Sequence, residues 1–212
     1  MRHFKLRIIY RTIIFLSFLS VLSGCASNKQ IDTSGATAIQ NKKLLITTGN
    51  RPKFVITTPS KGFLASQGLL GFIAVHALSE DLAVTYNIKD PAITISQKLK
   101  QRLSSQHKMQ VVEKGSYAQY ELKVMSTAFG AAHGTLNFSK YSANYGATAE
   151  LRDLRNNSII ASASCVEHGL KDADQAPTYD ELFANQARRL KDGLNVRAQR
   201  CTDKIINTIF GK

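Results

Sequence analysis

The sequence predicts an α+β domain: an antiparallel or mixed sheet of about four or five strands, packed by two helices of which the longer is C-terminal. Residues 141–151 alternate between apolar and polar side chains, which is typical of a half-buried antiparallel strand. Residues 178–209 carry apolar side chains at steps of three and four, which predicts a long amphipathic helix. The 212-residue chain is 43% hydrophobic, enough for one core, and shows no heptad array, Gly-X-Y period or 20–50-residue repeat.

The N-terminal residues have the layout of an export signal. Residues 1–11 contain four basic side chains and no acid, and residues 12–22 form an apolar run that is too short to span a bilayer. The next residues, Leu22-Ser23-Gly24-Cys25, resemble the bacterial lipobox, which lipoprotein-processing enzymes recognise. We therefore expect residues 1–24 to be a lipoprotein signal peptide. The alternatives are an ordinary secretory signal with a chance cysteine, or an uncleaved anchor.

The lipobox resemblance implies what happens to Cys25. A diacylglycerol would be attached to its sulfur, the chain would be cut after Gly24, and the new amino terminus would be acylated. Two or three lipid chains anchor a protein stably, because each buried CH₂ contributes about 0.8 kcal/mol. Ala26 follows instead of Asp, which in Gram-negative bacteria favours the outer membrane, facing the periplasm. In another organism the same lipid would anchor the protein to the cell membrane.

The mature chain divides into a linker and one domain. Residues 25–43 comprise the lipidated cysteine and a polar segment without periodicity, which we expect to be a flexible tether. Residues 44–212 then form a single periplasmic-type domain. It opens with two short β-branched runs, a weaker strand at 44–47 and a clearer one at 54–58, followed by a loop at 60–66.

Residues 68–78 are the most apolar stretch of the mature protein. Their length fits a buried helix or strand, and they are too few for a transmembrane segment. A core helix is the simpler interpretation. The alternative is a patch that faces a membrane or a protein partner.

A first amphipathic helix is predicted from Asp90-Pro91 onwards. Asp can accept hydrogen bonds from the free N–H groups of the first turn, and proline is tolerated at the first helical position. The apolar positions that follow recur at helical spacing, namely Ala92, Ile95, Leu99 and Leu103. Strands are expected next at 109–112 and 118–128, the second with Tyr120, Leu122 and Val124 on one face.

The alternating strand at 141–151 and the following run at 159–166 predict a hairpin. Residues 155–158 form its turn, because asparagine tolerates a positive φ. We expect Ile159, Ala161, Ala163 and Cys165 on the inner face of the second strand. The small alanine side chains leave room for a helix to lie close.

The C-terminal helix begins with a capping box, Thr178-x-x-Glu181. Its apolar stripe is predicted to contain Phe183, Ala187, Leu190, Leu194, Ala198, Cys201, Ile205 and Ile209. Basic side chains lie off this stripe, and four of them are candidates for an anion-binding face: Arg188, Arg189, Arg197 and Arg200.

Cys165 and Cys201 remain once Cys25 is assigned to lipid. Both fall on the predicted interface between the last strand and the last helix, as a disulfide requires. In an oxidising compartment we expect them to be bridged, with a gain of roughly 4 kcal/mol in the chain-entropy model. Two buried free thiols, or a metal pair that recruits His168, are the alternatives.

Two resemblances follow from these motifs. The order of strand, helix, strands and long C-terminal helix is similar to that of the small α/β domain at the amino end of TolB. Residues 145–154, then Ser164-Cys165, then Tyr179-Asp180-Glu181-Leu182 and finally Cys201 resemble a set of uncharacterised proteobacterial lipoproteins. The second resemblance covers roughly residues 90–210. It implies a fold and a compartment, and it supplies no catalytic residues.

No motif for catalysis or metal binding is visible. The five histidines, His3, His76, His107, His133 and His168, lack metal-ligand spacing. His133 lies in a Gly/Ala-rich segment, Phe129 to Gly134, which we expect to be a loop. We therefore predict no catalytic residue, no metal and no cofactor.

Three functions remain open. The favoured one is a non-enzymatic lipoprotein that binds or assembles with an envelope protein through a sheet edge or residues 68–78. The others are a binder of an anionic envelope polymer or lipid, and an envelope hydrolase with His133 or His76 beside a carboxylate. No small-molecule substrate is evident.

The net charge of +13 invites a nucleic-acid interpretation, but its location argues against one. Cleavage of the signal removes four of the 28 basic residues, which leaves 24 against 15 acids, a formal charge of +9. An exported protein meets no regular chromosome, so we predict a membrane attachment and a protein partner, and no nucleic acid.

Overall fold

The computed structural model describes residues 28–31, 39–57, 81–133, 139–168 and 176–211. Within these ranges the chain forms six strands and two long helices, which run in the order β1 Lys43–Thr48, β2 Val55–Thr57, α5 Pro91–Gln106, β3 Gln110–Val112, β4 Tyr120–His133, β5 Tyr141–Asp153, β6 Ser158–His168 and α6 Tyr179–Ile209. The predicted loop at 60–66 and the apolar segment at 68–78 lie outside the described residues.

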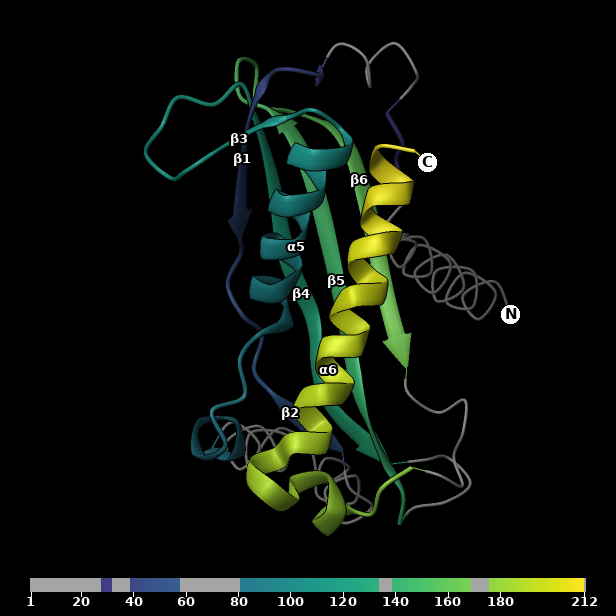
Figure 1. The fold of residues 1–212 in the computed structure, drawn as a ribbon. Helices are drawn as coiled ribbons and strands as arrows, with labels where there is room; N and C mark the ends of the chain where they lie inside the picture. The colour runs from purple at the N-terminus through teal and green to yellow at the C-terminus, as the bar shows by residue number, and fades with distance from the viewer. Residues whose placement is uncertain (1–27, 32–38, 58–80, 134–138, 169–175, 212) are drawn as a thin grey trace, which may run out of the picture.

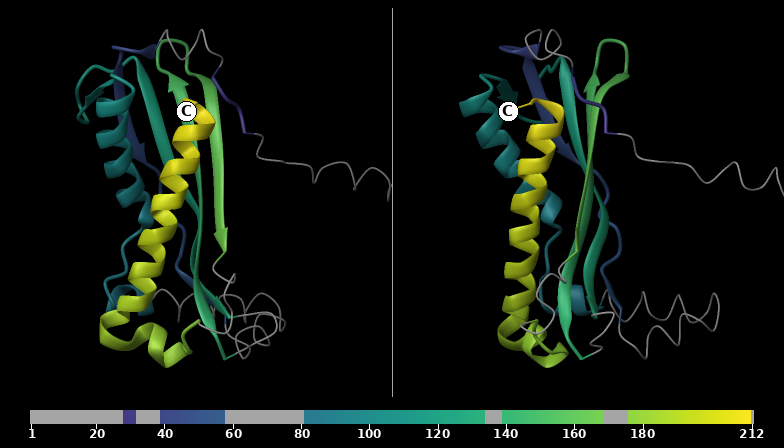
Figure 2. Two further views of the ribbon diagram at one scale, coloured as in Figure 1. Left: turned by 45° about the vertical axis from the view of Figure 1, so that its right-hand side comes forward. Right: turned by 90° about the vertical axis from the view of Figure 1, so that its right-hand side faces the viewer.

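One mixed sheet contains all six strands. Its order is β3-β1-β4-β5-β6, and β2 pairs with β4 farther along the edge that β1 occupies. β1 and β2 run parallel to their neighbours, whereas β4, β5 and β6 form an antiparallel meander. Helices α5 and α6 lie side by side on one face of the sheet (Figures 1 and 2). The predicted fold class is confirmed, with six strands where four or five were expected.

The central strand β5 shows the predicted alternation. Every odd-numbered residue from Tyr141 to Asp153 is buried, and these side chains face α6 or the rest of the core. On the sheet's other face, the register places Glu121 opposite Arg152 and Lys123 opposite Glu150. Opposite charges across a strand pair stabilise the sheet modestly and suit a surface in contact with water.

Strand β4 is longer than predicted and changes face midway. Tyr120, Leu122 and Val124 are buried as expected, but a bulge between Ser126 and Ala128 shifts the register by one residue. Beyond the bulge the odd-numbered residues, Phe129 and Ala131, become the buried ones. An extra residue in one strand has this effect because side chains alternate with a period of two.

The predicted loop from Phe129 to Gly134 is therefore wrong as far as His133, the last residue of β4. Gly130 explains the error. A Cβ atom at this position would lie 1.8 Å from the carbonyl oxygen of Val55, so the β2 backbone can approach β4 only where a glycine stands. The glycine that suggested a loop marks a close approach of two strands.

A second bulge corrects the expected inner face of β6. The register shifts opposite Leu151 and Arg152, so Ile159 is 39% exposed while Ala161, Ala163 and Cys165 are buried. Ile160 instead packs against the core. The predicted turn is present, and Asn157 adopts a φ of 58°.

Helix α5 begins as predicted. The side chain of Asp90 accepts a hydrogen bond from the N–H of Ala92 at 2.9 Å, and Pro91 occupies the first turn. The apolar positions predicted from Ala92 to Leu103 are all buried, and they lie against β1, β4 and α6.

Helix α6 has the predicted cap but is not continuous. Thr178 and Glu181 form both hydrogen bonds of the capping box, at 2.8 and 3.3 Å. The residues from Ala184 to Ala187 leave helical geometry, which separates a short first turn from the long helix (Figure 1). All eight predicted stripe residues are nevertheless buried. Packing against the sheet thus preserves the apolar face across the break.

Candidate functional site

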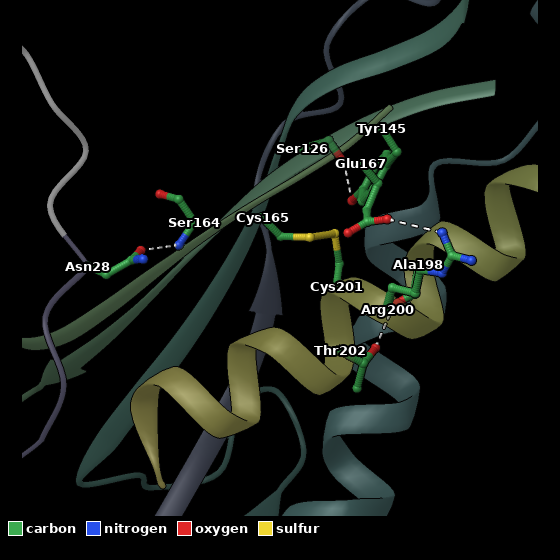
Figure 3. The surroundings of a disulfide bond; sticks show 10 residues. All are labelled: Asn28, Ser126, Tyr145, Ser164, Cys165, Glu167, Ala198, Arg200, Cys201 and Thr202. Carbon is green, nitrogen blue, oxygen red and sulfur yellow. Dashed lines mark hydrogen bonds and ion pairs between the residues drawn. A yellow bond between two sulfur atoms is a disulfide. The ribbon is translucent and has the colours of Figure 1, made fainter. Parts of the chain in front are cut away.

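A buried disulfide bond joins the last strand to the last helix (Figure 3). Cys165 of β6 and Cys201 of α6 are both 0% exposed, and their Cα atoms are 5.4 Å apart. This separation lies within the usual range for disulfides. The structure therefore contains the predicted bridge in place of free thiols or a metal pair. Such a bridge persists in proteins of oxidising compartments.

Small side chains let α6 lie close to the sheet around this bridge. Ala163 on β6 and Ala198 on α6 are buried beside the two cysteines. A Cβ atom on Gly193 would lie 3.2 Å from the Cβ of Ala143, so the helix and β5 also approach closely about two turns before Cys201. The predicted role of the alanine-rich inner face is thus confirmed by this packing.

Residues 28–31, which we call the N-terminal segment, lie along the outer edge of β6. Lys29 and Ser162 exchange two backbone hydrogen bonds, at 2.9 and 2.8 Å, as in an antiparallel bridge. The side chain of Asn28 accepts a hydrogen bond from the N–H of Ser164 at 2.8 Å (Figure 3). Ile31 is 9% exposed and donates to the carbonyl of Ile209 at the end of α6.

Within the expected tether, residues 25–43, this contact corrects the prediction for residues 28–31. The N-terminal segment is fixed to β6 and α6, and Ile39 farther along is 3% exposed. The polar composition without periodicity suggested flexibility. It could not reveal the contact with β6, because a single bridge between strands needs no alternating pattern. Cys25 and the lipobox lie outside the described residues.

The four arginines proposed as an anion-binding face do not share one face of α6. Arg188 and Arg197 are nine residues apart, which places them on opposite sides of a helix with 3.6 residues per turn. Arg188 lies 3.8 Å from Asp192 and Arg189 lies 3.8 Å from Glu181. An incoming anion would compete with these carboxylates.

The other two arginines lie near the disulfide. Arg200 pairs with Glu167 at 3.5 Å, beside the bridge (Figure 3). Arg197 donates a hydrogen bond to the carbonyl of Gly193 at 2.8 Å, and burial together with the nearby Arg200 lowers the pKa of its guanidinium. Arg197 thus packs against its own helix instead of projecting toward solvent.

Two histidines, His133 and His107, make ring contacts in the part of the chain that the structure describes. His133 ends β4, where its ring lies edge-on to Tyr141 with centroids 6.4 Å apart. His107 caps the end of α5 and packs on Phe210. Burial and the charge of Arg102 lower the pKa of His107. His76 lies outside the described residues, and among those described no group of three potential ligands could hold a metal ion.

One buried polar cluster, formed by Asp90, Ser126 and Tyr145, was not predicted from the sequence. The hydroxyl of Ser126 donates to the carboxylate of Asp90 at 2.5 Å and lies 2.8 Å from the hydroxyl of Tyr145. All three residues are at most 8% exposed, and burial raises the pKa of Tyr145. The same carboxylate caps α5, so the cluster ties that helix to β4 and β5.

The cluster is structural in its geometry. Ser126 lies beside the bulge of β4, and none of the three members lines the three grooves described below. The carboxylate of Asp90 accepts hydrogen bonds from the backbone N–H of Ala92 and from Ser126, so it caps the helix and binds β4 at the same time. Only the cap residue Asp90 indicated part of this cluster in the sequence. Serine and tyrosine are common in alternating strands, so Ser126 and Tyr145 did not stand out as members of a buried cluster.

Three shallow grooves can be described on the surface. The largest, about 460 Å³, lies beside the β2–β4 contact and is lined mainly by apolar and small side chains around Phe129 and Gly130. A second, of about 280 Å³, lies between Ile88 and Leu194, and a third contains Arg188 and Arg189. None of these three is lined by a histidine. None of the described helices has the length and apolar character needed to cross a membrane.

No protein-family model matches the chain, and no curated protein matches its sequence. Solved structures with a similar arrangement include a protein from Xanthomonas campestris, 12% identical with a TM-score of 0.45 over 82% of this chain and 89% of that one. PelC of Paraburkholderia phytofirmans, a dodecamer, is 12% identical with a TM-score of 0.39, over 88% and 96%. Uncharacterised lipoprotein B of Nitrosomonas europaea is 14% identical with a TM-score of 0.31, over 77% and 84%. Similarity at this level carries no argument about activity or partners.

Proposed function

We propose that the protein is a lipoprotein of the bacterial envelope, anchored through a lipid on Cys25 and facing the periplasm from the outer membrane. The observation that carries the proposal is the buried Cys165–Cys201 bridge. It fits the export signal at residues 1–24, because disulfides form and persist outside the reducing cytoplasm. The signal and the bridge are independent features that favour the same compartment.

The domain then serves as a non-enzymatic binding or assembly module. The buried polar side chains of one cluster hold structure: Asp90 caps α5, and Tyr145 and Ser126 complete the cluster. The pairing of Arg188, Arg189 and Arg200 with carboxylates gives little support to the alternative of an anionic-polymer binder. The resemblances to proteobacterial lipoproteins and to the TolB amino-terminal domain stay predictions.

The β3 edge of the sheet is the surface that fits a protein partner. The opposite edge, β6, is covered by the N-terminal segment, whereas β3 has one neighbour, β1, among the described strands. Tyr117, which follows β3, is 69% exposed. Tyrosine is enriched in protein interfaces, and an unpaired strand edge can accept another strand.

Photocrosslinking in intact cells tests this function. A photoreactive amino acid replaces either Tyr117, beside β3, or Val84, which is 73% exposed at a different place on the domain. We expect one discrete protein adduct from position 117 and none from position 84. Adducts of equal yield and pattern from both positions would contradict a specific protein-binding surface at β3.

A further inference from the structure

The N-terminal segment fixes how far the domain can lie from its lipid. Residues 28 and 29 are held on β6 by three hydrogen bonds of 2.8 to 2.9 Å. Only two residues, Ala26 and Ser27, lie between Cys25 and Asn28, so three Cα–Cα steps join them. A fully extended chain spans at most about 3.6 Å per residue, so the two Cα atoms are no more than about 11 Å apart.

We propose that the β6 edge of the domain rests directly on the phospholipid surface of the membrane, an inference that depends on the proposed lipidation of Cys25. The polar headgroup region is about 5–8 Å thick on each side of the bilayer. A lipid attached within about 11 Å of Asn28 therefore brings this edge to the headgroups. A free tether over residues 26–43 would instead have a root-mean-square length of about 25 Å.

The side chains on this edge suit a headgroup surface. Val166 lies on β6 two residues beyond Ser164, the partner of Asn28, and is 53% exposed. Lys29, on the N-terminal segment itself, is exposed and pairs with Ser162 through its backbone. An exposed apolar side chain and a long cationic one on the same edge can contact the lipid surface and its phosphates.

A protein strand is a poorer occupant for the same edge. The backbone N–H and C=O groups of Ser162 are already paired with Lys29, and the N–H of Ser164 is paired with Asn28. An added strand would have to displace the N-terminal segment first. Covering an edge in this way is a known defence against unwanted strand pairing.

This contact between the β6 edge and the phospholipid surface, which we call the seating, also orients the rest of the domain. Four strand spacings separate β6 from β3 in the sheet order, which places the β3 edge about 19 Å farther from the membrane. Figure 1 shows the N-terminal segment and the connection between β3 and β4 on opposite sides of the sheet. The proposed partner surface at β3 would therefore face the periplasm.

Spin-label measurements on the full lipidated protein test the seating. Vesicles of phosphatidylethanolamine and phosphatidylglycerol contain a small fraction of nickel-chelating lipid, whose Ni²⁺ relaxes nearby nitroxides. A nitroxide is attached through Val166→Cys or, as the matched exposed control, through Tyr117→Cys, with the native disulfide intact. We expect relaxation several-fold stronger at position 166. Equal relaxation at the two positions would overturn the seating.

A variant with a longer linker tests whether the short link between Cys25 and Asn28 causes the membrane contact. A long Gly/Ser segment inserted between Ser27 and Asn28 should reduce the relaxation at position 166 toward that at position 117. Unchanged relaxation after this insertion would overturn the role of the short link. Mass spectrometry of the same samples reports lipidation: a mature protein without lipid on Cys25 would overturn both proposals, whereas a lipidated, vesicle-bound protein with equal signals would overturn only the seating.

Discussion

Loss of the Cys165–Cys201 bridge should destabilise the domain by about 4 kcal/mol. The two cysteines are 36 residues apart in the sequence, so the bridge closes a loop that contains the start of α6 and most of its length. In the chain-entropy model, opening a loop of this size gives the unfolded chain a free-energy advantage of about 4 kcal/mol. Since whole domains are stable by about 5–15 kcal/mol, the bridge supplies a large share.

Urea unfolding of the mature domain measures this effect. The double variant Cys165→Ala/Cys201→Ala should lose about 2 M in its unfolding midpoint, if the denaturant slope is about 2 kcal/mol per M. Wild-type protein reduced before unfolding is the matched control, because it opens the same loop without deleting either sulfur. A midpoint that moves by less than about 0.5 M in both samples would refute the loop-closure argument.

Three further predictions concern the caps and the buried groups. Thr178→Ala should destabilise the domain by about 1 kcal/mol in urea unfolding, because it removes the cap of α6; an unchanged midpoint would show that the first turn is not coupled to folding. Tyr145→Phe should destabilise by about 1 kcal/mol, since Ser126 loses a buried hydrogen-bond partner, and a more stable variant would contradict the cluster. His107 has a lowered pKa in the folded state, so stability should be complete above pH 6.5 or so and fall as the pH drops from there through the folded pKa. His107→Gln should flatten that limb of the stability curve, and an identical slope in the variant would assign it to another group.

Much of the fold follows from local patterns that tertiary structure did not override. The alternation around Tyr145 predicted β5 because the strand is central and one face meets the helices. The capping box at Thr178 and the proline after Asp90 marked both helix starts. Cys165 and Cys201 could be paired because each lies on the buried face of its own element.

The remaining features depend on contacts between distant parts of the chain. Gly130 suggested a loop, yet it is needed because the carbonyl of Val55 lies where its Cβ would be. The bulge beside Ser126 changes the buried face of β4 without leaving a mark in the pattern. The break before Arg188 left the apolar spacing of α6 intact, so periodicity alone could not detect it.

The attachment site illustrates the same division. The residues that resemble a lipobox, Leu22 to Cys25, form a local motif that is visible in the sequence, and lipidation of Cys25 stays a prediction. The bridge between Lys29 and Ser162 joins residues 133 positions apart, and neither residue has a strand pattern that predicts the pairing. The carboxylate partners of Arg188, Arg189 and Arg200 could likewise be identified only in the folded structure.

Intact-mass spectrometry of the mature protein from membranes tests the central claim most directly. A lipid-anchored protein should lack residues 1–24 and carry the added mass of a diacylglyceryl group and an amino-terminal acyl group on Cys25. The Cys25→Ala variant should keep its signal peptide and gain no lipid. A wild-type protein that retains residues 1–24, or that is cleaved elsewhere and carries no lipid, would contradict the assignment of this chain as an envelope lipoprotein.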